Sequence, residues 1–156
     1  MDGTPRRDLL SGVGDPDDTG AADERLGAAL AAYAADPGRE PVVLAALGSA
    51  RVLVPVVAEL GESETSADGL VRDKSADMAT VLMRGADGRL ALLAFTSLES
   101  MHRWDPEARP VPVPAHVAAQ AAVQDGAVAL LLDVAGPVAY AAAVSVPRES
   151  SATIER

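Results

Sequence analysis

The sequence contains no cysteine and very few aromatic residues. Without cysteine, the chain has no disulfide, no thiolate nucleophile and no thiolate metal site. Only 3% of its 156 residues are aromatic, including a single tryptophan. The hydrophobic fraction is nevertheless 49%, so alanine, valine and leucine must fill the core of what the length predicts to be one domain.

Clustered basic residues are also missing. The formal net charge is -10, whereas nucleic-acid binding requires cations that neutralise phosphates. The chain has no basic amphipathic helix for an anionic membrane surface and no apolar run of the roughly 20 residues that cross a bilayer. Arg6 and Arg7 are not followed by the apolar stretch of a signal peptide. We therefore expect a cytoplasmic protein that binds neither nucleic acid nor membrane.

Catalytic and metal-binding motifs are absent too. The two histidines, His102 and His116, do not have the spacing of a metal-binding pair. Near His102 in sequence lie Ser97, Ser100 and Asp105. Triad members usually converge from separate elements, and no G-x-S-x-G elbow exposes a serine here. We expect a hydroxyl of this cluster to cap a helix, and we expect a protein that is not an enzyme, with no catalytic residue, metal or cofactor.

The strongest local signal is a β-hairpin at the centre of the chain. Two apolar runs, 78–84 and 89–95, flank the turn 85–88, whose Asp-Gly pair favours a reversal because glycine accepts a positive φ. Both faces of the second run are apolar, so we expect it to be covered on both sides. Residues 96–99 then match a capping box. They predict a helix that ends before Asp105-Pro106.

Hydrophobic periodicity and turn residues predict the remaining elements. Further helices are expected at 21–35, 41–47 and 115–124, although 42–44 also fits an extended chain. Further strands are expected at 51–58, 127–134 and 138–146, and 108–114 should be extended. Pro55 cannot donate to a ladder, which predicts that its strand lies at an edge or carries a bulge.

The order of these elements predicts a single α/β domain of the α+β type. Its mixed sheet of about five strands should contain the central hairpin and carry the helices packed against it. The two helices between residues 95 and 127 leave room for a crossover between parallel strands. The domain should span 21–147, with 60–77 as a loop. An acidic disordered tail is expected at 1–20 and a second tail at 148–156.

One pattern of residues resembles a known family. It consists of Asp73-Lys74-x-Ala76-Asp77-Met78-Ala79, the hairpin, and Ala94-Phe95-Thr96-Ser97-Leu98-Glu99 with Trp104. The strand RVLVPVV at 51–57 and the segment LDVAGP at 132–137 match as well. Over about residues 22–137, the chain resembles the N-terminal domain of SseB-family proteins, which are named for enhanced serine sensitivity.

The resemblance implies a compact α/β domain with no established catalytic residues. It also implies an effect on serine metabolism through a sulfurtransferase partner. Because the chain has no rhodanese cysteine, such chemistry would belong to the partner. The richness in alanine, arginine, aspartate and glycine is typical of high-GC coding, which favours the actinobacterial type of this family.

These observations lead us to expect a non-catalytic binding or adaptor domain with an unknown protein partner. The expected contact surface lies at the carboxyl end of the strand 90–95, where open α/β sheets place ligands. It comprises Arg51, Lys74, Thr96, Trp104 and Asp105. Trp104 either plugs the edge of the core or is an exposed anchor for the partner.

Two alternatives stay open at this point. Asp73 and Asp77 would serve a carboxylate-dependent hydrolase, and a deep apolar pocket would indicate a small-molecule-binding regulator. A homodimer would cover the exposed edge strand expected at 138–146.

Overall fold

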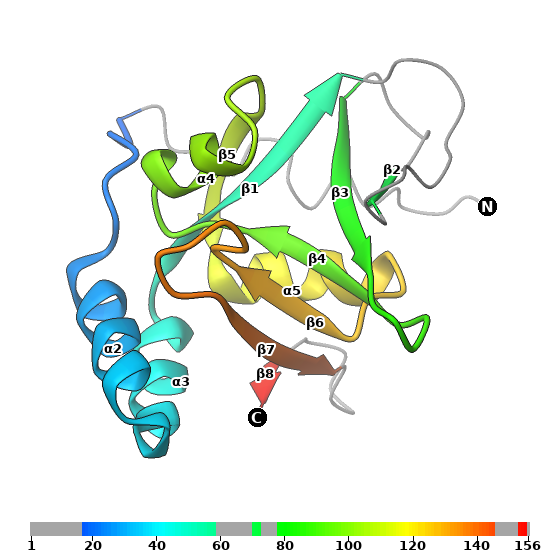
Figure 1. The fold of residues 1–156 in the computed structure, drawn as a ribbon. Coiled ribbons are helices and arrows are strands. Elements are labelled where there is room, and N and C mark those ends of the chain that lie inside the picture. The colour runs from blue at the N-terminus through cyan, green and yellow to red at the C-terminus, as the bar shows by residue number, and fades with distance from the viewer. Residues whose placement is uncertain (1–16, 59–69, 73–77, 146–152, 156) are drawn as a thin grey trace.

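A computed structural model describes residues 17–58, 70–72, 78–145 and 153–155 (Figure 1). Most of the predicted tail 1–20 and of the loop 60–77, with Asp73, Lys74 and Asp77, lies outside these residues. Within them, no helix is both long and apolar enough to cross a membrane.

The domain is built on one mixed sheet with the strand order β5-β1-β3-β4-β6-β7-β8, and β2 pairs with β3 at the side. Its strands are β1 (Arg51–Ala58), β2 (Leu70–Arg72), β3 (Met78–Arg84), β4 (Leu90–Ala94), β5 (Arg109–Pro114), β6 (Ala129–Leu132), β7 (Tyr140–Ser145) and β8 (Thr153–Glu155). Only β4 and β6 run parallel. This confirms the α+β class and is consistent with the expected crossover.

The helices cover the sheet from two sides. They are α2 (Glu24–Ala35), α3 (Glu40–Gly48), α4 (Leu98–Trp104) and α5 (Ala115–Gln124), with a 3-10 turn η1 (Pro37–Arg39) after α2. In Figure 1, α2 and α3 lie side by side at one flank of the sheet, and α5 lies behind β4 and β6. Helix α2 begins at Glu24 rather than at residue 21 because the Asp23 carboxylate caps it by accepting the Leu26 amide.

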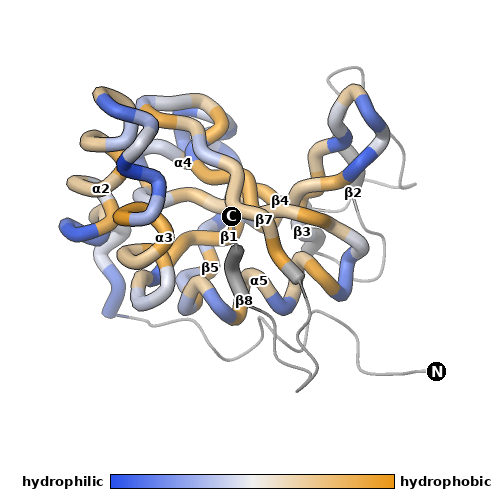
Figure 2. The backbone as a smooth tube through the Cα atoms, turned by 90° about the horizontal axis from the view of Figure 1, so that it is seen from below, coloured by the Kyte–Doolittle hydropathy of each residue, from blue (hydrophilic) through white to orange (hydrophobic). Residues whose placement is uncertain are grey.

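Both faces of β4 are buried, as the sequence predicts. Leu92 and Ala94 face the larger core, which contains α2, α3 and α5. Leu93 and Phe95 face a smaller core with Met101 of α4. Figure 2 shows that the central strands are largely hydrophobic and that hydrophilic stretches lie at the periphery.

The sheet has eight strands, whereas the sequence predicts about five. The five expected strands are present, and three more segments pair with them. The extended segment at 109–114 becomes β5, while β2 and β8 form inside the predicted loop and the predicted C-terminal tail. Strand β7 is therefore not a fully exposed edge, because β8 pairs with it from Ala143 to Ser145.

The sequence predicts that β1 lies at an edge or carries a bulge at Pro55. The edge position is wrong, because β1 lies between β5 and β3. Pairing with β5 is continuous from Arg51 to Val56, so that ladder has no bulge either. Leu53 pairs with Phe95 through two hydrogen bonds of 2.7 and 2.8 Å, and pairing with β3 starts at Val56. Pro55 lies between these two pairings, where β1 changes partner. Its missing N–H therefore interrupts no ladder bond.

Candidate functional site

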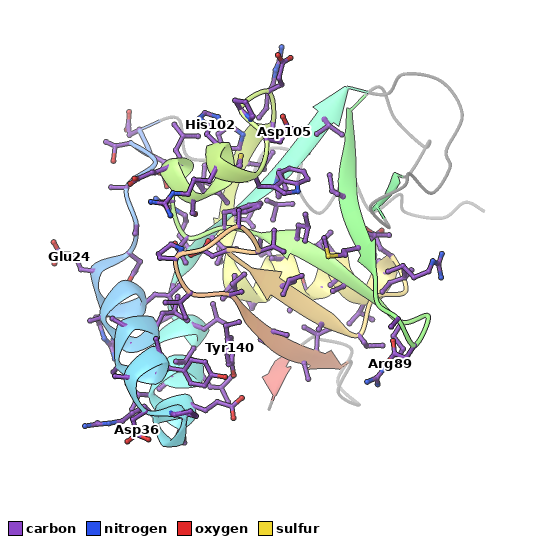
Figure 3. All side chains as sticks on the ribbon, viewed as in Figure 1. Glu24, Asp36, Arg89, His102, Asp105 and Tyr140 are labelled. Atoms are coloured by element: carbon purple, nitrogen blue, oxygen red, sulfur yellow. The ribbon has the colours of Figure 1, made fainter. Side chains whose placement is uncertain are left out.

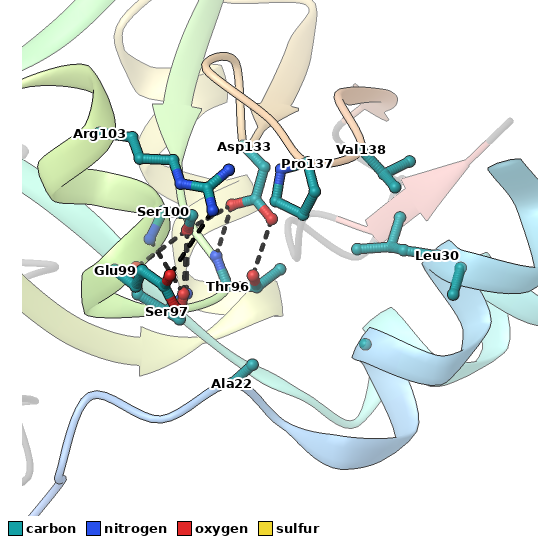
Figure 4. Close-up of a pocket in the computed structure, with 12 residues that line it drawn as sticks. Ala22, Leu30, Thr96, Ser97, Glu99, Ser100, Arg103, Asp133, Pro137 and Val138 are labelled. Atoms are coloured by element: carbon teal, nitrogen blue, oxygen red, sulfur yellow. Dashed lines mark hydrogen bonds and ion pairs between the residues drawn. The ribbon is translucent and has the colours of Figure 1, made fainter.

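A pocket of about 350 Å³ lies between α2, the start of α4 and the turn that follows β6 (Figure 4). Its apolar wall comes from α2 and the turn, through Leu30, Ala31, Pro137 and Val138. Its polar side comes from the segment after β4 and from Asp133. The remaining lining residues are Ala22, Gly27, Thr96, Ser97, Glu99, Ser100 and Arg103.

The buried carboxylate of Asp133 forms the polar floor of this pocket. Only 2% of Asp133 is exposed to solvent. Its Oδ1 accepts the Thr96 amide at 2.8 Å and the Ser100 hydroxyl at 2.9 Å, and its Oδ2 accepts the Thr96 hydroxyl at 2.7 Å. The residue has a positive φ of 52°, which aspartate tolerates better than most residues.

The parallel pairing of β4 and β6 brings these groups together. Ala94 pairs with Leu132 at the carboxyl ends of the two strands. Thr96 and Asp133 follow these ends, so their side chains meet although they are distant in sequence. The carboxyl ends of parallel strands are the usual place for ligands in open α/β sheets.

Helix α4 begins one residue later than the capping box in the sequence predicts. Ser97, not Thr96, is the N-cap, and the Ser97 hydroxyl accepts the Ser100 amide at 3.1 Å. The Ser100 hydroxyl accepts the Ser97 amide in return at 3.2 Å. Thr96 is not the cap because its hydroxyl donates to Asp133. The predicted partner, Glu99, instead extends outward and lies 3.5 Å from Arg103.

An N-terminal strap, residues 18–22, passes over the start of α4 and closes one side of the pocket with Ala22. The Arg51 guanidinium binds this strap through Nη2 to Asp18 Oδ1 at 2.8 Å and through a bond to the Ala21 carbonyl. Its Nη1 donates to the Thr96 carbonyl at 2.9 Å. Residues Asp17 to Gly20 thus belong to the described structure, although the sequence places them in a disordered tail.

The ionisation of Asp18 reflects its contact with Arg51. Burial by itself raises the pKa of the Asp18 carboxyl. Hydrogen bonds from Arg51 and from the Gly20 amide outweigh burial, so the pKa lies below its ordinary value.

The structure brings together two of the residues predicted as a contact surface. Arg51 and Thr96 are in contact, but Thr96 is only 6% exposed and Arg51 is engaged by the strap. Trp104 is half-buried and its ring packs on Phe95 with centroids 5.6 Å apart, as expected of a plug at the core edge. Asp105 ends α4, where its carboxylate accepts the Glu107 amide. Lys74 lies outside the described residues.

The histidines do not take part in the pocket. His102 and His116 are both exposed, and Figure 3 shows His102 on the outer side of α4. The cap formed by Ser97 confirms the structural interpretation of the serine and histidine cluster. Over the part of the chain that the structure describes, no three acidic or histidine side chains gather in a way that would hold a metal ion.

Sequence reasoning missed Asp133 as a site residue. The available signal is its position, directly after an apolar strand and before the Gly136-Pro137 turn. A carboxylate at the end of a parallel strand is a common site element. Its partner Thr96 cannot be identified from the sequence, because the two residues meet only through the pairing of β4 with β6.

A comparison with protein families decides the classification of this fold. The model of the SseB protein N-terminal domain matches residues 26–144, which is most of the chain. The chain belongs to the SseB family. No curated protein and no solved structure matches it. The residues that match the SseB domain include Thr96, Ser100 and Asp133, whereas the N-terminal strap precedes them.

Proposed function

We propose that this SseB domain is a non-catalytic binding domain and that the pocket above Asp133 is its binding site. The observation that carries this proposal is the pocket itself, which combines a buried polar floor with an apolar wall. Its volume of about 350 Å³ is within the range of small-ligand sites. A ligand held there would contact α2, α4 and the turn after β6 at once.

The hydrogen bonding of the floor supports binding rather than catalysis. The Thr96 and Ser100 hydroxyls both donate to Asp133, and both residues are almost fully buried. The Ser97 hydroxyl caps α4. A nucleophilic hydroxyl has to be free to attack a substrate, whereas each of these three hydroxyls is engaged in a hydrogen bond that holds the backbone in place.

A pocket-filling substitution tests the proposal. Gly27 of α2 lines the pocket, and a Cβ added there meets nothing within 4 Å. We therefore expect Gly27→Leu to occupy part of the pocket without straining the helix, and leucine favours helix more than glycine does. Gly48→Leu is a matched control, because Gly48 is exposed at the end of α3 with equal space around it.

The measurement is a screen of small fragments by amide chemical shifts of the ¹⁵N-labelled full chain. We expect a group of fragments that shift the Thr96 and Ser100 amides in the wild type and in Gly48→Leu. These fragments should lose their effect in Gly27→Leu. A screen in which every fragment binds both variants alike, or in which none shifts these amides, contradicts the proposal.

A further inference from the structure

We propose that the pocket accepts an alkylammonium group, meaning a protonated amine on a short aliphatic chain. This inference rests on the proposed function and names the chemical class of its ligand. It follows from the negative charge of Asp133, from the apolar wall and from Arg103, the one cationic side chain among the described lining residues, which is half exposed and paired with Glu99.

The first observation is that the buried Asp133 carboxylate has no ion-pair partner among the described residues, although Arg103 lines the same pocket. Asp133 accepts hydrogen bonds only from neutral groups among the described residues: the amide and hydroxyl of Thr96, and the Ser100 hydroxyl, whose one proton is shared with the Ser97 carbonyl. No described arginine, lysine or histidine forms an ion pair with it. Burying a carboxylate away from cations is unfavourable, and a cation that reaches it gains correspondingly.

Asp133 also has room for one more donor. A carboxylate offers about four acceptor positions over its two oxygens. Within the part of the chain that the structure describes, Oδ1 accepts two hydrogen bonds, whereas Oδ2 accepts one, from the Thr96 hydroxyl. An ammonium group supplies both the missing charge and the missing donor. The resulting charge-assisted bond is stronger than one from a neutral hydroxyl.

The apolar wall indicates what carries the ammonium. Leu30, Ala31, Pro137 and Val138 offer no hydrogen-bonding side chain. They suit methylene groups, which gain from leaving water. A bare metal ion fits less well, because divalent cations need several oxygen ligands and the second carboxylate, Glu99, is 81% exposed on its side chain and paired with Arg103.

Arg103 is a cationic side chain in the pocket lining and would favour an anionic ligand instead. Its side chain lines the pocket and is 50% exposed, and it pairs with Glu99 over 3.5 Å. Such an exposed pair contributes little, because solvent screens it. A charge beside the buried Asp133 is screened far less. The net charge of -10 also raises the local concentration of cations rather than anions.

The test is a titration of the ¹⁵N-labelled full chain with n-butylammonium chloride, with sodium butanoate and n-butanol as probes of equal chain length. We expect saturable shifts of the Thr96 and Ser100 amides with n-butylammonium and much weaker effects from the other two. Nα-acetyl-lysine methylamide is a further probe. Equal binding by this probe identifies a lysine side chain of a protein as a possible source, and binding by n-butylammonium alone identifies a small free amine.

Two variants sharpen the result. Asp133→Asn keeps the shape, tolerates the positive φ and removes the charge, so it should weaken n-butylammonium about tenfold, as expected for losing a hydrogen bond to a charged group. Arg103→Gln removes a repelling cation and should tighten n-butylammonium binding. If Asp133→Asn fails to fold, Arg103→Gln still tests the charge of the ligand. It should tighten the binding of n-butylammonium and weaken the binding of butanoate.

The cationic assignment is overturned if butanoate binds the wild type more tightly than n-butylammonium does and loses this binding in Arg103→Gln. The proposed binding function would then remain intact. The same holds if pocket-dependent fragments exist but n-butylammonium shifts neither amide. The proposed function itself fails only if no fragment depends on Gly27. The two failures are therefore distinguishable.

Discussion

Thr96 and Asp133 are joined by two hydrogen bonds across 37 positions of the chain, from the Thr96 amide at 2.8 Å and from its hydroxyl at 2.7 Å. This pair fixes the loop after β4 to the turn after β6. Through the Thr96 carbonyl, the same residue is bound by Arg51 and hence connected to the N-terminal strap. The pocket floor and the strap therefore form one hydrogen-bonded unit.

The Thr96 hydroxyl should contribute measurably to stability. Thr96→Val keeps the shape but leaves Asp133 Oδ2 without its donor. We expect a loss of about 1–3 kcal/mol in the free energy of unfolding, as is usual for a buried polar group that loses its partner. Thr96→Ser retains the hydroxyl and is the control. Urea denaturation measures both, and equal stability of the two variants would show that this hydrogen bond is not important.

Much of the local structure was predictable because neighbouring residues determine it. The hairpin turn is set by Gly85, Asp87 and Gly88, and the Gly85 amide donates to the Arg89 carbonyl as a tight reversal requires. Helix α5 has the predicted bounds, Ala115–Gln124. The unbroken apolar run along β4 correctly predicts two buried faces, since successive side chains of a strand point to opposite faces.

The site was less predictable because it depends on strand pairing. The sequence singles out Thr96 but assigns it to a surface, since its hydrogen bond to Asp133 exists only once β4 pairs with β6. Pro55 was similarly misread. Proline excludes a ladder bond at one position, and the sequence does not show that β1 changes partner at that position.

Two glycines of the pocket region should respond to alanine with opposite signs. Gly20 of the strap has a φ of +84°, and an added Cβ would lie 2.9 Å from Leu98 Cβ. Gly20→Ala should therefore destabilise the protein by roughly 1–2 kcal/mol, the usual cost of placing a side chain at positive φ. Gly27 is helical with open space around it, so Gly27→Ala should stabilise by about 0.5–1 kcal/mol.

Thermal unfolding of the two variants beside the wild type measures both effects. The hydrogen bond from the Leu98 amide to the Gly20 carbonyl, 2.8 Å long, gives a local reading. Exchange of this amide with solvent should accelerate in Gly20→Ala and stay unchanged in Gly27→Ala. Equal stability of the two variants would refute the described path of the strap.

The ion pair between Asp18 and Arg51 should make the strap sensitive to acid. Because the pKa of Asp18 is lowered in the folded state, its contribution is present above the unfolded value of about 3.8. It is lost as pH falls through the folded pKa. Below about pH 4, the wild type should lose the contribution of the ionised Asp18 to its free energy of unfolding. The variant Asp18→Asn lacks this contribution at every pH.

Urea denaturation at neutral pH and near pH 3 measures this difference. Glu107→Gln is the control, since it removes an exposed carboxylate outside the strap. The difference in free energy of unfolding between the wild type and Asp18→Asn should be smaller at the lower pH. The corresponding difference for Glu107→Gln should not decrease in the same way. A constant gap for Asp18→Asn would mean that its charge does not hold the strap.

The prolines of β5 should protect one edge of the sheet from pairing with a second chain. The N–H and C=O groups of Leu53 point toward Phe95, so by alternation those of Val54 and Val56 point toward β5. Their partners Val111 and Arg109 point back at β1. The remaining β5 residues face outward and are the prolines Pro110, Pro112 and Pro114. An edge without N–H donors is a poor template for strand addition.

Restoring donors to this edge tests the idea. The double variant Pro110→Thr and Pro112→Thr gains two outward N–H groups, and we expect greater self-association than in the wild type as concentration rises. Val111→Thr is the matched control, because it adds the same side chain and no outward donor. Light scattering over a concentration series measures the average mass. If the double variant and Val111→Thr behave alike, the prolines do not guard the edge, and the apolar side chains of β5 must be considered instead.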